Sequence, residues 1–132
     1  MELEKNCALL VIDIQQEDFK EMREDNFHDS AWDCIRNAKR VLDVFRAKHL
    51  PVIQIKEVHR PDMVDFGREL DGSEGVHCIE DSPGTDYAEL TYPIAGEYLI
   101  SKRRYSAFFG TDLEILLKGL HVDTLYLIGG FT

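Results

Sequence analysis

A three-layer α/β/α domain, in which helices cover both faces of a parallel sheet, is the fold class that the sequence predicts. Three observations predict it. Apolar strand-like runs alternate with helix-like segments along the chain. The first run, residues 7–12, is continuously apolar, as in a strand covered on both faces. The order strand, helix, strand, long excursion, strand, helix, strand is typical of parallel strands joined by right-handed crossovers.

The first helix and the second strand follow the apolar run. Asp29 or Ser30 can cap the helix, because a short polar side chain there accepts a backbone N–H. The segment Lys48-His49-Leu50-Pro51 ends the helix, and Pro51 opens a strand at 52–56. One face of the helix carries apolar residues at helical spacing, namely Trp32, Ile35, Ala38, Leu42 and Phe45.

A long segment, 57–96, comes next and is rich in Asp, Glu, Gly and Pro without a sustained period. Long irregular segments in compact domains are usually functional. The third strand is predicted at 97–101, directly before Lys102. Thr111 can cap the second helix, and the fourth strand is predicted at 122–128.

Four residues directly follow predicted strands: Asp13, Glu57, Lys102 and Gly129. In a Rossmann-like parallel sheet the carboxyl ends of the strands share one edge, and ligands bind beyond it. We therefore expect these four residues to lie on a common rim.

Composition narrows the class of partner. With 25 acidic against 15 basic residues, the net charge of −10 disfavours nucleic acid and anionic membranes, so a small molecule is the expected partner. The N-terminus lacks the pattern of a secretory signal, and no apolar run approaches membrane-spanning length. Cys7, Cys34 and Cys78 have no C-x-x-C spacing, so we expect buried or half-buried thiols in a cytoplasmic protein.

Five fragments of the chain form an ordered set. They are Leu10-Val11-Ile12-Asp13-Ile14-Gln15, Glu57-Val58-His59-Arg60-Pro61, His77-Cys78 with Ser82-Pro83-Gly84-Thr85, Lys102-Arg103-Arg104-Tyr105-Ser106-Ala107-Phe108, and Gly129-Gly130-Phe131-Thr132. In this order they resemble the isochorismatase-like cysteine hydrolases, a family that includes nicotinamidases, N-carbamoylsarcosine amidohydrolases, biuret hydrolases and isochorismatases. Residues 102–111 are most similar to its amide and ureide branch. The resemblance implies that residues 1–132 are an isochorismatase-like hydrolase domain whose C-terminal part is missing, and that the protein is a homo-oligomer.

This resemblance implies a Cys-Asp-Lys triad. Asp13 matches the aspartate that takes the proton from the thiol, and Lys102 matches the lysine that balances charge and orients the carbonyl. The nucleophilic cysteine is expected just after Thr132, and no cysteine of this chain matches it. The implied reaction cleaves a C–N bond of a small amide, carbamoyl or ureide compound through a thioester. Two alternatives stay open: vinyl ether hydrolysis of the isochorismatase type, and a catalytically incompetent fragment without its nucleophile.

The triad also makes chemical sense, because a thiol attacks only as a thiolate, and a carboxylate base beside a cation favours that form. Each residue nevertheless has a simpler interpretation. Taken alone, Asp13 caps the turn after its strand, and Lys102 is a solvated charge in the basic run Lys102-Arg103-Arg104.

The remaining candidates concern substrate and metal. Phe19 and Tyr105 resemble residues that line the family's substrate pocket, although Phe19, like Phe108 and Phe109, could equally belong to the core. The resemblance to the amide and ureide branch implies that no cofactor is required. One carboxylate and two imidazoles at Glu57, His59 and His77 suit zinc, manganese or iron, because Glu57-x-His59 places both side chains on one face of an extended segment. Hydrogen-bonded pocket residues are the alternative for these three.

Overall fold

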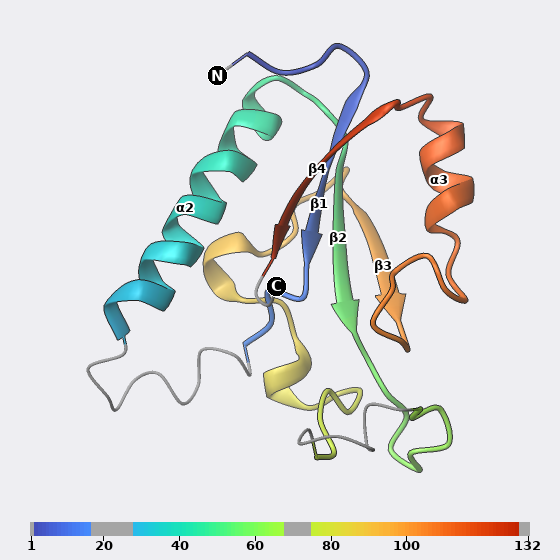
Figure 1. Cartoon of the computed structure of the whole chain (residues 1–132). Coiled ribbons are helices and arrows are strands. Elements are labelled where there is room, and N and C mark those ends of the chain that lie inside the picture. Colours follow the sequence, from blue (N-terminus) through green and yellow to red (C-terminus); the bar gives the residue numbers. More distant parts are fainter. Residues whose placement is uncertain (1, 17–27, 68–74, 130–132) are drawn as a thin grey trace.

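The structure, a computed structural model, describes residues 2–16, 28–67 and 75–129 (Figure 1). Within them, four parallel strands form one sheet in the order β3-β2-β1-β4, which confirms the predicted fold class. The elements are β1 (Cys7–Ile12), α2 (His28–Ala47), β2 (Val52–Glu57), the 3-10 turns η3 (Pro83–Thr85) and η4 (Glu89–Thr91), β3 (Tyr98–Lys102), α3 (Leu113–Gly119) and β4 (Thr124–Gly129).

Two helices cover opposite faces of the sheet (Figure 1). Side chains of a strand point alternately to its two faces. Leu9 and Val11 of β1 therefore join the core under α2, whereas Leu10 packs in the separate core under α3. A strand that is buried on both faces needs a continuous apolar run, and this explains the sequence of β1.

The helix starts differ from prediction. Because α2 begins at His28, Asp29 and Ser30 lie inside the helix and neither precedes it as a cap. The N-cap position of α3 is Asp112, whose side chain makes no capping hydrogen bond; the Thr111 hydroxyl instead accepts from the N–H of Leu113 at 3.2 Å. No helix in the described part of the chain has the length and apolar character needed to span a bilayer.

Strand order brings the predicted rim together. The chain runs outward from β1 to β2 and β3, then returns to place β4 on the other side of β1. Ile12 of β1 is level with Gly129 of β4, and Glu57 of β2 is level with Lys102 of β3. The rim therefore contains the point where strand order reverses, which is where ligands bind in open parallel sheets.

A buried ion pair joins α2 to the loop before β3. The guanidinium of Arg46 donates to both carboxylate oxygens of Glu97 at 2.9 Å, and the Glu97 side chain is 6% exposed. The N–H of Ile94 and the amide of Gln54 also donate to Glu97. Burial alone raises the pKa of Glu97, but these hydrogen bonds outweigh it, so the pKa lies below its ordinary value.

We expect Glu97→Gln to lower the free energy of unfolding at pH 7 by about 3 kcal/mol, because it leaves Arg46 without a charged partner. A depressed carboxyl pKa stabilises the fold above the unfolded-state pKa, and this contribution is lost as the pH falls through the folded-state pKa. Urea unfolding from pH 7 to pH 3 should therefore show a smaller loss of unfolding free energy in the variant than in the parent.

Glu114→Gln, which breaks an exposed pair with Lys118, is the control and should leave the midpoint of urea unfolding unchanged. Equal pH slopes for Glu97→Gln and the parent would contradict this account.

Candidate active site

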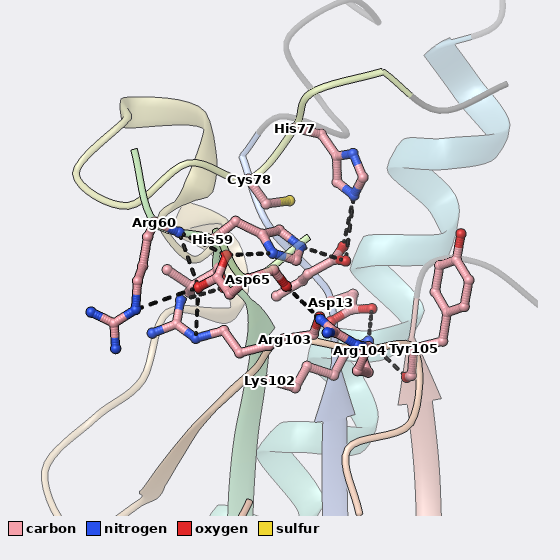
Figure 2. A network of polar contacts seen from close by, with 12 residues as sticks. Asp13, His59, Arg60, Asp65, His77, Cys78, Lys102, Arg103, Arg104 and Tyr105 are labelled. Carbon is pink, nitrogen blue, oxygen red and sulfur yellow. Dashed lines mark hydrogen bonds and ion pairs between the residues drawn. The ribbon is translucent and has the colours of Figure 1, made fainter. Parts of the chain in front are cut away.

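An ion pair between the buried Lys102 and the partly buried Asp13, whose side chain is 28% exposed, lies at the carboxyl edge of the sheet (Figure 2). Lys102 is the last residue of β3, and its side chain is 2% exposed. Its ammonium reaches past the end of β2, 2.9 Å from Asp13 Oδ2, and also donates to the carbonyl of Tyr105 at 2.9 Å. A buried ammonium costs several kcal/mol unless it is paired, so Lys102 depends on Asp13.

Asp13 adopts an unusual backbone conformation with φ of 56°. Aspartate tolerates this left-handed region better than most residues do. Its N–H still donates to the carbonyl of Ile55 on β2 at 2.9 Å, so the turn after β1 is tied to the neighbouring strand. The turn thereby holds the carboxylate at the sheet edge, beside the end of β3.

The two oxygens of the Asp13 carboxylate differ. Oδ2 faces Lys102, whereas Oδ1 is buried without a hydrogen-bond partner among the described residues. Burial raises the pKa of Asp13 above its ordinary value, Lys102 opposes this rise, and the charge of Glu57 adds to it. An unpaired carboxylate oxygen with a raised pKa is suited to accept a proton from a neighbouring group.

Gln15 links the ion pair to the second half of the rim. Its buried amide accepts from the N–H of Glu57 at 2.9 Å and donates to the carbonyl of Glu57 at 3.0 Å. It also donates to the carbonyl of Thr85 at 2.7 Å. In the sequence, Gln15 is distinguished only as part of the motif 10–15, because its hydrogen-bond partners lie 42 and 70 residues away and leave no local signal.

Glu57, His59 and His77 converge at the end of β2, and Figure 2 shows the two histidines. Nε2 of His59 lies 3.1 Å from Glu57 Oε1, and Nε2 of His77 lies 3.3 Å from Glu57 Oε2. The predicted shared face of Glu57 and His59 is confirmed. The ring of Phe66 stacks on the fully buried ring of His59, with 3.9 Å between the ring centroids. The sequence did not indicate this contact.

The hydrogen bonds behind the two imidazoles test whether this group fits a metal ion. Nδ1 of His77 lies 2.6 Å from the carbonyl of Gly75, which can only accept, so Nδ1 carries the proton. Nδ1 of His59 faces the carboxylate of Asp65 at 3.3 Å. With the ring proton on Nδ1, each imidazole directs its Nε2 lone pair toward the Glu57 carboxylate, and converging acceptors of this kind can hold a cation. The donor set fits zinc, manganese or iron.

The other predicted residues lie as follows. The Tyr105 side chain is 62% exposed beside the ion pair, and Phe19 lies outside the described residues. Phe108 and Phe109 are 52% and 68% exposed, so the core interpretation of these two is wrong. Their exposure follows from their position in the turn before α3, outside both apolar clusters.

The three cysteines differ in burial. Cys7 is buried at the start of β1, at the opposite end of the strand from Asp13. Cys34 is exposed on α2, so the expectation of a buried or half-buried thiol is wrong there. Cys78 is partly buried, and its Sγ lies 3.9 Å from the amide nitrogen of Gln15, beside the site.

A depression of about 440 Å³ opens between the ends of β2 and β3 and the segment 80–86. It shares no residue with the ion pair or the Glu57 group, and its lining mixes two cations with three carboxylates. Charges of both signs are mixed in this lining, so it does not favour a charged ligand of one sign. The candidate active site is therefore the rim with Asp13, Lys102 and Glu57.

Comparison with known proteins gives one family match and several relatives. Residues 7–132 match the isochorismatase domain family. The chain is 31% identical over 128 residues to the uncharacterized isochorismatase family protein YwoC of Bacillus subtilis, covering 95% of this chain and 63% of YwoC, less than two thirds of its length.

Two solved structures share the fold. N-carbamoylsarcosine amidase from Thermoplasma acidophilum is 31% identical with a TM-score of 0.78, covering 95% of this chain and 68% of that one. Pyrazinamidase of Pyrococcus horikoshii in complex with zinc is 25% identical with a TM-score of 0.77, covering 97% and 72%.

We expect Asp13→Asn and Lys102→Met to be strongly coupled in their effects on stability. Asp13→Asn leaves the buried ammonium without a charged partner and should lower the free energy of unfolding by about 3 kcal/mol. Lys102→Met leaves the partly exposed carboxylate unpaired and should lower it by less. The double variant removes both charges, so its loss should fall short of the sum by more than about 1 kcal/mol. Urea unfolding measures all three. The exposed pair of Glu114 and Lys118 provides a control cycle, in which Glu114→Gln and Lys118→Met should be additive. Additive losses at Asp13 and Lys102 would mean that the ammonium is not held by this carboxylate.

Proposed function

The chain belongs to the isochorismatase domain family, and on that premise we propose that the whole protein is a cysteine-dependent hydrolase of small amide, carbamoyl or ureide compounds. One observation carries the proposal: Asp13 has one carboxylate oxygen held by Lys102 and the other buried without a partner among the described residues. The relatedness to N-carbamoylsarcosine amidase, a C–N hydrolase by name, supports this substrate class.

The proposed reaction begins with proton transfer to Asp13. Oδ1 accepts the proton of a cysteine thiol, which we expect just after Thr132, and the thiolate attacks the carbonyl carbon of the substrate. Asp13 then returns the proton to the departing nitrogen, the C–N bond breaks, and a thioester remains. Water, activated by Asp13, cleaves the thioester and restores the thiol.

Lys102 acts through its charge. Its ammonium lies 2.9 Å from Asp13 and balances the negative charge that moves between the thiolate, the carboxylate and the carbonyl oxygen. The carbonyl of Tyr105 holds the other side of the ammonium, so the position of Lys102 does not depend on substrate. The exposed ring of Tyr105 and the ring of Phe19, outside the described residues, are the proposed substrate contacts.

We further propose that Glu57, His59 and His77 hold one divalent ion, zinc, manganese or iron. When bound, such an ion polarises a carbonyl oxygen or orients water. The convergence of the three side chains, and the acceptors that lie behind Nδ1 of both imidazoles, support this proposal. The zinc in the related pyrazinamidase structure agrees with it.

The cellular context is also a proposal. Cys7, Cys34 and Cys78 are all free thiols in the structure, which supports a reducing cytoplasm. The exposed rings of Phe108 and Phe109 support a homo-oligomer, since exposed aromatic residues are enriched at interfaces. Light scattering on the whole protein measures the oligomeric state directly.

Ammonia release from nicotinamide, N-carbamoylsarcosine, biuret and maleamate is the first activity test. The whole protein should hydrolyse at least one of them, and iodoacetamide should abolish the activity. Asp13→Asn and Lys102→Ala should each lower kcat by about 10²–10⁴-fold, because each removes a group that handles the transferred proton or its charge. Cys34→Ser, on the exposed face of α2, is the matched control and should keep full activity.

Two results would redirect the assignment. Full activity in both Asp13→Asn and Lys102→Ala would exclude the triad. Hydrolysis of isochorismate with no ammonia release from any amide would favour the vinyl ether reaction instead.

Metal binding is tested separately with Zn²⁺ alone. Titration calorimetry should find about one ion bound per chain, and His77→Ala should bind less than one equivalent because it removes one of the three ligands. His121→Asn is the control: His121 is exposed, and asparagine tolerates its φ of 56°. Unchanged binding in His77→Ala would place the ion elsewhere.

A further inference from the structure

A carboxylate outside the Glu57 group lies against the back of His59. Asp65 Oδ1 is 3.3 Å from His59 Nδ1, on the opposite side of the ring from Glu57. The His59 ring is fully buried, and the Asp65 side chain is only 16% exposed. Because Nδ1 and Nε2 lie on opposite sides of the imidazole, Asp65 cannot bind the same cation as Nε2, but it can hold the ring.

Asp65 is itself firmly held. Both of its carboxylate oxygens accept from the N–H of Arg60, at 3.1 and 3.2 Å. Arg103 also lies 3.6 Å from Asp65 Oδ2. A carboxylate that accepts backbone hydrogen bonds beside a guanidinium is ionised at neutral pH and can only accept hydrogen bonds.

The basic run after β3 fastens this loop to the sheet. Arg103 donates to the carbonyl of Val58 and lies 3.6 Å from Asp65 Oδ2, while Arg104 donates to the main-chain carbonyl of Asp65 (Figure 2). Lys102 reaches Asp13 instead. Lys102 thus pairs with the Asp13 carboxylate, whereas Arg103 and Arg104 hold Asp65 through its side chain and its main chain respectively.

From this arrangement we propose that Asp65 is a positioning residue that keeps the His59 proton on Nδ1 and directs the Nε2 lone pair toward Glu57 and His77. The inference rests on the proposed metal site. A carboxylate behind a metal-binding histidine fixes the ring orientation and makes the imidazole a better ligand. The arrangement at His77 is analogous, with the Gly75 carbonyl in place of the carboxylate.

Two measurements test the proposal on Asp65→Ala, Asp65→Asn and Asp62→Ala. Long-range ¹H–¹⁵N NMR of the metal-free protein locates the His59 ring proton, and Zn²⁺ titration measures affinity. Asp65→Ala should lose the hydrogen-bonded Nδ1 proton and weaken Zn²⁺ binding by about 10–100-fold. Asp65→Asn should retain the Nδ1 proton, because its amide oxygen still accepts, and should bind Zn²⁺ more tightly than Asp65→Ala.

Asp62→Ala is the matched control. Asp62 lies in the same loop and accepts from the N–H of Val64 at 3.2 Å, without a hydrogen bond or ion pair to His59. Asp62→Ala should change neither the position of the His59 ring proton nor the Zn²⁺ affinity. If Asp65 only supported the loop, Asp65→Ala and Asp62→Ala would give the same result in both measurements.

The outcomes separate this inference from the proposed function. A parent with its His59 proton on Nε2 alone would overturn the role of Asp65, whether or not the variants fold. Equal Zn²⁺ affinities for the parent and Asp65→Ala would also overturn it, with the metal site itself intact. A parent that keeps the Nδ1 proton but binds no Zn²⁺ would support the positioning role and reject the metal.

Discussion

The burial of the Lys102 ammonium is the constraint on which the candidate site depends. A charge that is 2% exposed must be paired within the domain. Lys102 ends β3, its partner Asp13 directly follows β1, and β2 lies between these two strands. The pair therefore forms only when three strands are in register. The same ion pair therefore affects both folding and the acidity of Asp13. Burial of the Asp13 carboxylate raises its pKa, and the charge of Lys102 opposes this rise.

The rim contains two centres that are physically linked. Gln15, two residues after Asp13, holds the backbone of Glu57 through two hydrogen bonds, so the turn after β1 positions the end of β2. The charge of Glu57 in turn raises the pKa of Asp13. A cation placed between Glu57 and the two histidines would weaken that effect, so occupancy of one centre would alter the acidity of the other.

Much of this was predictable because periodicity and strand ends are local signals. The run of β1, the apolar face of α2 and the common rim of Asp13, Glu57 and Lys102 followed from the sequence and are present in the structure. The helix starts were less predictable, because Asp29 and Ser30 suit a cap as well as a first turn. Gln15, Asp65 and Phe66 were not assigned roles, since each acts on a partner that is distant in sequence or reached by a loop.

The sequence by itself determined the parallel sheet, the placement of Asp13 and Lys102 at strand ends, and the shared face of Glu57 and His59, because these follow from residue spacing and strand geometry. Only the tertiary structure decided which oxygen of Asp13 faces Lys102 and which is left without a partner. It also decided that Arg103 and Arg104 hold the loop of Asp65 while Lys102 does not. Side-chain direction and burial arise from packing across strands, and no local pattern encodes which of three adjacent cations becomes buried.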